Sequence, residues 1–419
     1  MLKEKRNINI YSNKAPIGLG ACQVFAICLK NLMVKENNIM INKIVLTVSP
    51  IFSIPPKSAA AIESWMYNVA KRLDIENRIV CIQNDGYSKH SVVNKHCEIE
   101  RIKFGKVYTR LFKKWTRLDP YSYADRIVKI KHQFAPTANE SVIFVHNHIK
   151  SFKKIIKKEG HSHVVLHMHN FYEPKDVPED IKIIVPSRFM QSWYRERLPN
   201  AFIEVVRNGF DGDIYAQPPE VSRDDFGLTT DDKVVLFAGR IARDKGLLEL
   251  MQACQTFFKS DSRCKLVIVG DPNAALKGEL AQYQDEVKDY AKHLGEQCIF
   301  LGGVHPEKIR HYYSLADVIA VPSIAPEPFC MVALEAMASG RPVIASQRGA
   351  MVEFIAHNKT GFIFREPLSP EMMAEDITNA LNHPDKQKIA DNAKQHAYEN
   401  FTWEIVKDEL LSVIKKWYS

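Results

Sequence analysis

Residues 318–340 read VIAVPSIAPEPFCMVALEAMASG and predict a strand, a loop and a helix in succession. The uncharged apolar run that ends at Val321 is typical of a strand buried on both faces of a parallel sheet. Prolines break the next segment, and Pro328 is a favourable first residue for a helix. Gly340 closes the predicted helix, because glycine readily adopts the left-handed conformation at a helix end. The segment is one strand–helix unit of an α/β protein.

The same unit recurs on both sides of this stretch. Strands are predicted at 44–48, 78–82, 142–146, 164–168 and 181–185, and then at 234–238, 264–269, 298–301, 318–321 and 343–345. Strands that alternate with helices in this way predict doubly wound parallel sheets. We therefore expect two Rossmann-like domains, 40–212 and 213–419, that face each other across a cleft. Residues 1–39 are expected to be a loosely ordered extension.

Composition excludes a disordered chain, collagen, a coiled-coil rod and a small disulfide-stapled protein. The 419 residues are 46% hydrophobic and 25% charged, as in an ordinary globular protein, with a formal net charge of +8. That mild excess suits an anionic partner and does not by itself indicate nucleic acid. The eight cysteines show no metal-binding spacing, and no segment has the roughly 18 uncharged apolar residues that cross a bilayer.

Two carboxylates stand out in the opening stretch. Glu327 lies at the predicted positive end of the helix and Glu335 follows eight residues later, about 12 Å along the helix axis. This distance is close to the reach from a hexose across a diphosphate to a ribose. Backbone N–H groups near Cys330 and Met331 would point at the phosphates. Helix capping and solvent exposure are the alternative explanation for the two glutamates.

A second loop carries cations. After the strand 234–238, Gly239 turns the chain and places Arg240 at the carboxyl end of the strand, with Asp244, Lys245 and Gly246 following. A guanidinium fork and an ammonium group on one loop suit a diphosphate. Exposed loop cations are common, so the interpretation depends on the Glu327 segment, which follows later in the same predicted sheet.

Together these motifs resemble the donor-binding half of the family 4 retaining glycosyltransferases of GT-B fold. The motifs are FAGRIARDKG, VIVGD, YYSLADV and PEPFCMVALEAMASGRPVIAS, in that order over about 120 residues. The first half, with FKKWTRLDP and HMHNFYEP, resembles lipopolysaccharide core glycosyltransferases. The likeness is greatest to enzymes that add an α-1,2-linked N-acetylglucosamine to an outer-core glucose. It implies that 40–212 binds the acceptor and that 213–419, with its C-terminal helix, binds the nucleotide-sugar donor.

The resemblance also implies roles for individual residues. Arg240 and Lys245 match the pair that holds the donor diphosphate, Glu327 the residue that contacts the transferred sugar, and Glu335 the residue that binds ribose. His169 matches a histidine at the cleft floor, with His167 as its rival. The remaining expected contacts are Phe329, Cys330 and Met331 for the donor, and Lys57, Ser58 and Glu63 for the acceptor.

No metal or other cofactor is expected. Asp211-Gly212-Asp213 has the D-x-D pattern of metal-dependent transferases, in which a cation bridges the diphosphate. It follows an Asn-Gly turn in a connector, so we interpret it as structural. Arg240, Lys245 and the helix N-terminus can supply the positive charge instead.

The stretch Arg101–Arg117 contains no acidic residue and interleaves basic with aromatic side chains. Such a pattern suits acidic lipid headgroups or the phosphates of a core glycolipid. The alternative is a helix with its aromatic face in the core. On the first interpretation the protein is cytoplasmic and peripheral on the inner membrane.

The resemblance implies a retaining, UDP-sugar-dependent transferase that moves N-acetylglucosamine from UDP-GlcNAc onto a glucose of the lipopolysaccharide outer core. Glucosyl or other hexosyl transfer in lipopolysaccharide or polysaccharide assembly remains open. So do a sugar-nucleotide epimerase or glycan phosphorylase on the same fold and a non-catalytic glycolipid-binding module.

Overall fold

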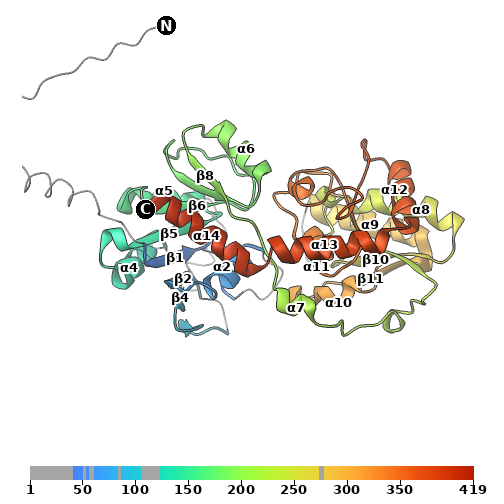
Figure 1. Cartoon of the computed structure of the whole chain (residues 1–419), viewed down its shortest axis with the longest axis horizontal. Coiled ribbons are helices and arrows are strands. Elements are labelled where there is room, and N and C mark those ends of the chain that lie inside the picture. Colours follow the sequence, from blue (N-terminus) through green and yellow to red (C-terminus); the bar gives the residue numbers. More distant parts are fainter. Residues whose placement is uncertain (1–40, 51–52, 56–60, 84–85, 105–122, 273–277) are drawn as a thin grey trace, which may run out of the picture.

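The computed structural model describes residues 41–50, 53–55, 61–83, 86–104, 123–272 and 278–419. The predicted extension 1–39, Lys57 and Ser58, and residues 105–117 of the basic stretch lie outside the described residues. The described chain forms two lobes side by side, each built around its own sheet (Figure 1).

The first sheet has the order β3-β4-β2-β1-β5-β6-β7-β8, and only the β3–β4 pair is antiparallel. Its strands are β1 (Lys43–Thr47), β2 (Glu76–Ile82), β3 (His90–Val92), β4 (Cys97–Ile102), β5 (Ser141–His146), β6 (Val164–His167), β7 (Lys182–Val185) and β8 (Phe202–Val205). The central strands are buried on both faces, which explains their continuous apolar sequences.

The second sheet is entirely parallel and has the order β11-β10-β9-β12-β13-β14. Its strands are β9 (Lys233–Ala238), β10 (Cys264–Val269), β11 (Cys298–Gly302), β12 (Val318–Val321), β13 (Val343–Ala345) and β14 (Phe362–Ile363). Strands β9 and β12 are neighbours, so the loops that follow them leave the same edge of the sheet side by side. The predicted pair of doubly wound domains is confirmed.

Helices cover both faces of each sheet, as the four apolar clusters show. In the first lobe α2 and α14 pack on one face and α4, α5 and α6 on the other; in the second, α8, α9 and α12 oppose α10, α11 and α13. Their bounds are α2 (Ala61–Ala70), α4 (Tyr123–Phe134), α5 (Ile149–Glu159), α6 (Arg188–Arg197), α7 (Gly212–Ala216), α8 (Leu247–Ser260), α9 (Glu279–Leu294), α10 (Ile309–Tyr313), α11 (Met331–Ala338), α12 (Pro370–Asn382), α13 (Lys386–Asn400) and α14 (Trp403–Tyr418). Short 3-10 turns include η3 (Arg243–Lys245) and η6 (Ala350–Glu353).

Within the described residues the chain crosses between the lobes twice, and the two crossings are hydrogen-bonded to each other. The Phe210 N–H donates to the Phe401 carbonyl at 3.0 Å, and the Trp403 N–H donates to the Phe210 carbonyl at 3.1 Å. After the second crossing α14 enters the core of the first lobe, where Trp403, Val406 and Leu410 are buried. The predicted second domain, 213–419, includes this helix, but α14 lies with the first lobe (Figure 1). Its apolar side chains belong to the core of that lobe.

Candidate active site

Two loops of the second lobe meet at the carboxyl edge of its sheet. The loop after β9 ends at Gly246, which has a φ of +70° and lies so close to the loop after β12 that an added Cβ would stand 2.1 Å from the Pro322 carbonyl oxygen. The Ile324 N–H donates to the Asp244 carbonyl at 2.9 Å. Glycine is therefore required at position 246, and the close approach fixes Lys245 relative to the second loop.

This contact brings Lys245 and Glu327 together. The Lys245 Nζ lies 2.7 Å from Glu327 Oε1, and Ser323 donates its hydroxyl to the same oxygen at 2.6 Å. The Glu327 side chain is buried. Burial opposes the charge on Lys245, but the neighbouring Glu327 and Asp244 carboxylates outweigh it and raise the pKa of Lys245. An ammonium group thus stays charged in a partly desolvated position.

Arg240 is placed differently from Lys245. Its side chain is 70% exposed, and its guanidinium lies 3.5 Å from the Asp244 carboxylate. It therefore projects from the same loop without entering the Lys245–Glu327 pair. An exposed guanidinium of this kind is available to an anion that enters from solvent.

The helix α11 starts at Met331, three residues later than the sequence predicts. Glu327 instead forms a parallel bridge with Gly349, and Cys330 turns the chain with a φ of +83°. This local pairing displaces Pro328 from the helix. The Phe329 ring packs inward, 5.3 Å from the ring of Phe354, whereas Cys330 and Met331 are half-buried at the helix N-terminus.

Glu335 lies on α11 in a desolvated position. Tyr313 donates its hydroxyl to Glu335 Oε2 at 2.8 Å. Burial raises the pKa of Glu335 to about 7, and the Tyr313 hydrogen bond offsets part of this effect. A carboxyl group near its midpoint at neutral pH is typical of functional sites. No role was predicted for Tyr313 or Ser323. Their positions were the available signal, because Tyr313 precedes the predicted strand 318–321 and Ser323 follows it.

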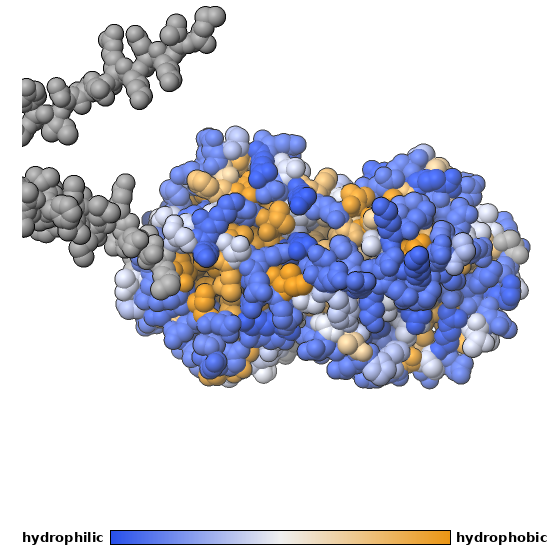
Figure 2. All heavy atoms as spheres, viewed as in Figure 1, coloured by the Kyte–Doolittle hydropathy of each residue, from blue (hydrophilic) through white to orange (hydrophobic). Residues whose placement is uncertain are grey.

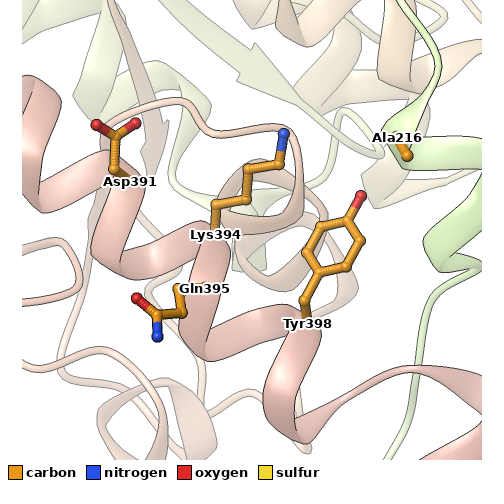
Figure 3. A pocket seen from close by; sticks show the side chains of 5 residues that line it. All are labelled: Ala216, Asp391, Lys394, Gln395 and Tyr398. Carbon is orange, nitrogen blue, oxygen red and sulfur yellow. The ribbon is translucent and has the colours of Figure 1, made fainter.

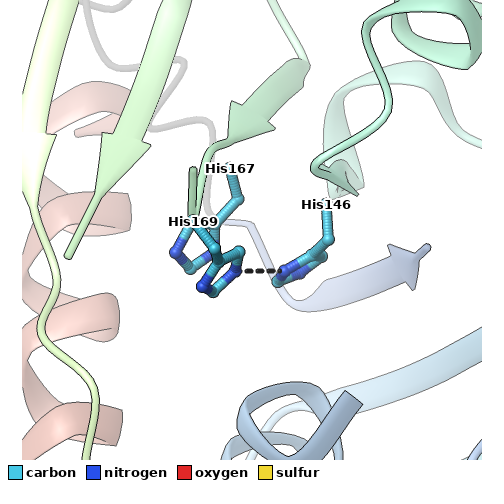
Figure 4. Close-up of side chains that lie close together, drawn as sticks. All are labelled: His146, His167 and His169. Carbon is cyan, nitrogen blue, oxygen red and sulfur yellow. Dashed lines mark hydrogen bonds between the residues drawn. The ribbon is translucent and has the colours of Figure 1, made fainter. Parts of the chain in front are cut away.

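In the first lobe, three histidines gather at the carboxyl ends of β5 and β6 (Figure 4). His146 and His167 are fully buried and His169 is 6% exposed. The His146 Nδ1 and the His169 Nε2 are 3.1 Å apart and form a hydrogen bond. Trp65 packs against all three rings. Burial lowers the pKa of His169 to about 3 and those of the other two well below the usual value, so all three are neutral near pH 7.

The spacing of these histidines also allows a metal site, because their ligand atoms lie within 4.8 Å of one another. Ring geometry favours the hydrogen bond. The His146 and His169 centroids are 5.4 Å apart with planes inclined by 19°, so the 3.1 Å between the nitrogens plus one ring radius at each end spans the whole separation. The nitrogens therefore point at each other. Two ligands of one ion would direct their lone pairs at a common point instead.

The structure also places Glu63 and Arg101, two residues of the first lobe for which the sequence makes predictions. Glu63 is buried in the first turn of α2, burial raises its pKa, and its Oε1 has no hydrogen-bond partner among the described residues. The prediction that Arg101 belongs to an exposed basic surface is wrong. Arg101 is 1% exposed at the end of β4, where it donates to the Ile54 and Ser88 carbonyls and to Ser91. These acceptors satisfy the guanidinium inside the fold.

The acidic triplet after the first crossing has a structural role. Asp211 caps α7 by accepting from the Ile214 N–H at 3.2 Å and pairs with Arg72 at 2.9 Å.

Near α7, a cavity of about 390 Å³ lies between Ala216 and α13 (Figure 3). It is lined by Ala216, Asp391, Lys394, Gln395 and Tyr398, and contains none of the predicted site residues.

Two lobes of this topology, with a partly buried cation–carboxylate pair at the edge of one sheet and histidines at the edge of the other, are typical of a glycosyltransferase of GT-B fold. Residues 219–398 match the protein family described as glycosyl transferases group 1. A lipopolysaccharide 1,2-N-acetylglucosaminetransferase of Salmonella typhimurium is 45% identical over 380 residues, which cover 90% of this chain and 100% of the relative. The chain belongs to this family of glycosyltransferases.

Solved structures agree on the fold. The sucrose-phosphate synthase of Thermosynechococcus elongatus aligns with a TM-score of 0.71 at 19% identity, over 89% of this chain and 98% of that one. HepE of Anabaena, solved with UDP and glucose, aligns with a TM-score of 0.67 at 20% identity, over 89% and 99% of the two chains. No helix in the described part of the chain is both long and apolar enough to span a membrane.

Proposed function

We propose that this chain transfers N-acetylglucosamine from UDP to a glucose hydroxyl of a lipopolysaccharide outer core, with retention of the anomeric configuration. The observation that carries the proposal is the 45% identity over the full length of the Salmonella typhimurium enzyme. That alignment covers most of the first lobe, where the acceptor is expected to bind. Similarity confined to the second lobe would speak for the donor alone.

The second lobe supports a role for Lys245 and Arg240 in holding the diphosphate. Lys245 keeps its charge beside Glu327, and Arg240 is exposed on the same loop. At about 4 Å, two unit charges near a protein surface interact by about 4 kcal/mol at an effective dielectric constant of 20. Cations of this kind stabilise the charge that develops on UDP as it departs. Because they supply positive charge themselves, we propose that transfer needs no metal.

We propose that Glu327 and Glu335 bind the sugar and the ribose respectively. Glu327 offers a buried carboxylate whose Oε1 is already held by Lys245 and Ser323, which leaves Oε2 for a sugar hydroxyl. Glu335 offers its second oxygen beside the Tyr313 hydrogen bond. The glycosidic bond to the diphosphate breaks while the acceptor oxygen bonds the anomeric carbon on the same face. The departing phosphate oxygen takes the acceptor proton.

His169 is proposed to orient the sugar from the first lobe. In a pair of neutral imidazoles with one shared hydrogen bond, one further N–H remains, either on His146 Nε2 or on His169 Nδ1. Neither atom has a partner among the described residues. Both nitrogens are buried, and we assign the N–H to His169 because that residue, at 6% exposure, lies nearer the surface than the fully buried His146. His169 Nδ1 is then a donor for a sugar oxygen, and His146 sets this tautomer.

We also propose peripheral binding to an anionic membrane surface. Lys103 to Arg117 supply the basic and aromatic side chains of the sequence prediction, without Arg101. The helix α5 adds lysines at 150, 153, 154, 157 and 158 in the first lobe. Co-sedimentation with vesicles tests this: binding should require acidic lipid and fall with salt. Equal binding to neutral vesicles would contradict it.

The transfer reaction is tested with purified protein, UDP-GlcNAc and a core oligosaccharide that ends in the acceptor glucose. We expect an α-linked N-acetylhexosamine product by mass and NMR analysis, undiminished by EDTA. UDP-glucose in parallel tests the competing donor, and preferential hexose transfer would overturn the donor assignment. Turnover of UDP-GlcNAc without acceptor would indicate an epimerase, and failure to bind UDP would indicate a non-catalytic module.

A further inference from the structure

The N-terminus of α6, in the first lobe, is completed by a carboxylate from the second. The first N–H groups of a helix have no partner within the helix. Here the Met190 N–H donates to the Ser187 hydroxyl oxygen at 3.1 Å, within the lobe. The Arg188 and Phe189 N–H groups donate to the two oxygens of Glu353, at 3.0 and 2.6 Å. The dipole of α6 favours a negative charge at this position.

The same helix end also holds the loop that carries Glu327. Ser187 donates its hydroxyl hydrogen to the Pro328 carbonyl at 2.7 Å, again between the lobes. Pro328 is the neighbour of Glu327 in the chain. Ser187 thus accepts from its own helix and donates to the opposite lobe with one hydroxyl group, which only serine or threonine can do in this position.

Glu353 is tied to Glu327 from the other side. It ends the turn η6, whose first residue, Ala350, donates its N–H to the Glu327 carbonyl at 3.0 Å. Gly349 precedes this turn with a φ of +82°, and an added Cβ there would stand 2.2 Å from the same carbonyl oxygen. The Glu327 backbone is therefore bound by η6 and continues directly into Pro328. Both η6, through Glu353, and Pro328 contact the start of α6.

We propose that Ser187 and Glu353 are positioning residues that form an interlobe clasp and hold Glu327 in its working place. The inference rests on the proposed contact of Glu327 with the transferred sugar. All three clasp hydrogen bonds join the lobes, so they break together when the lobes separate. The clasp therefore couples approach of the acceptor lobe to the placement of Glu327. The proposed UDP contacts, Arg240, Lys245 and Glu335, make no hydrogen bond with Ser187 or Glu353 among the described residues, so we expect UDP to bind without the clasp.

The test uses the full chain with Glu353→Gln and Ser187→Ala. Glutamine keeps one acceptor oxygen but loses the charge and the second acceptor. Alanine removes both the bond to Pro328 and the cap on the Met190 N–H. Charge-assisted hydrogen bonds are the stronger ones, so we expect kcat for transfer to fall about tenfold to a hundredfold in E353Q. UDP affinity by calorimetry should change less than about threefold, because neither variant removes a proposed contact with UDP and the loss of one typical hydrogen bond would cost about fivefold. Ser187→Thr should restore most of the rate, since threonine also caps helices.

Glu375→Gln serves as the matched control. Its carboxylate pairs with Arg365 at 2.8 Å within the second lobe and is exposed, so it removes the same charge without touching the clasp. Its kcat should equal that of the wild type. Small-angle scattering with UDP-GlcNAc should show a larger radius of gyration for E353Q than for the wild type and the control.

The outcomes separate clearly. A fall in kcat with unchanged UDP affinity, together with the expanded particle, supports the clasp. Unchanged kcat and scattering in both variants overturn it, and so does a parallel loss of UDP affinity, transfer rate and melting temperature, which would mean a purely structural role. If the wild type transfers no sugar, the proposed function fails instead, and scattering alone then decides whether Glu353 holds the lobes together.

Discussion

Glu335→Gln is expected to make the protein more stable and less able to bind UDP. Burial raises the pKa of Glu335 to about 7, from an ordinary value of 4.5. Between these two pH values the unfolded chain carries the ionised carboxylate while the folded protein retains the proton. The folded state therefore binds more protons, and stability falls as the pH rises from about 4.5 to 7.

The magnitude follows from that difference in pKa. At about 1.4 kcal/mol per pH unit, a rise from 4.5 to about 7 corresponds to roughly 3.5 kcal/mol of lost stability above pH 7. Glutamine does not titrate, and its oxygen can still accept from the Tyr313 hydroxyl. The variant should gain up to this amount at pH 8 and almost nothing at pH 4.5. For a domain of this size the full gain equals roughly 7–14 °C in the melting temperature.

Calorimetric melting of wild type and variant from pH 4.5 to 8 measures the stability effect. Titration with UDP at pH 8 measures binding, which should weaken by about tenfold or more because the ribose loses a charged acceptor. Wild-type UDP affinity should also fall as the pH drops below 7, whereas the variant should show no such dependence. Parallel melting curves across the whole pH range would refute the assignment of a desolvated carboxylate at Glu335.

Three other changes test the site. Lys245→Ala should lower kcat about 10²- to 10³-fold in a transfer assay, the usual effect of removing one group that stabilises developing charge; an unchanged rate would contradict a role at the leaving group. Gly246→Ala should destabilise the second lobe by at least about 2 kcal/mol, since the new Cβ would stand 2.1 Å from Pro322. Its control is Gly227→Ala, with a similar φ of +68° and nothing within 4 Å, and equal melting temperatures would show that the close contact is relieved. His169→Ala should lower kcat by up to about a hundredfold, because the transferred sugar loses a group that orients it, with UDP affinity unchanged by calorimetry. Because the pKa of His169 is about 3, the wild-type rate should show no histidine titration between pH 6 and 8, and a wild-type midpoint near 6.5 that the variant lacks would count against the neutral pair.

The fold was predictable because its central strands are apolar along their whole length. The predicted bounds of β10, β12 and β13 agree with the structure, since strands buried on both faces need no polar residue. β4 was missed because its sequence, Cys-Glu-Ile-Glu-Arg-Ile, mixes charged residues into a short strand near the edge of the sheet. The edge strand β3 has only three residues and no apolar pattern.

The proximity of Lys245 and Glu327 was partly predictable. Each follows a strand of one parallel sheet, and the structure places β9 and β12 next to each other. Arg101 shows the opposite case. Arginine is usually solvated, and no local sequence pattern predicts that two carbonyls and a serine hydroxyl accept its hydrogen bonds in the interior. Arg188 and Glu353 are likewise 165 positions apart in the chain, so only the folded arrangement shows that they meet.

The return of α14 to the first lobe has a consequence for biosynthesis. Domains generally fold in the order in which the ribosome produces them. Here, however, the first lobe lacks Trp403, Val406 and Leu410 of its own interior until translation is almost complete. A nascent chain released before Trp403 would present an uncovered apolar surface beside α2. The first lobe therefore cannot complete its core before the last helix is synthesised. A truncated product should need chaperones to remain unaggregated.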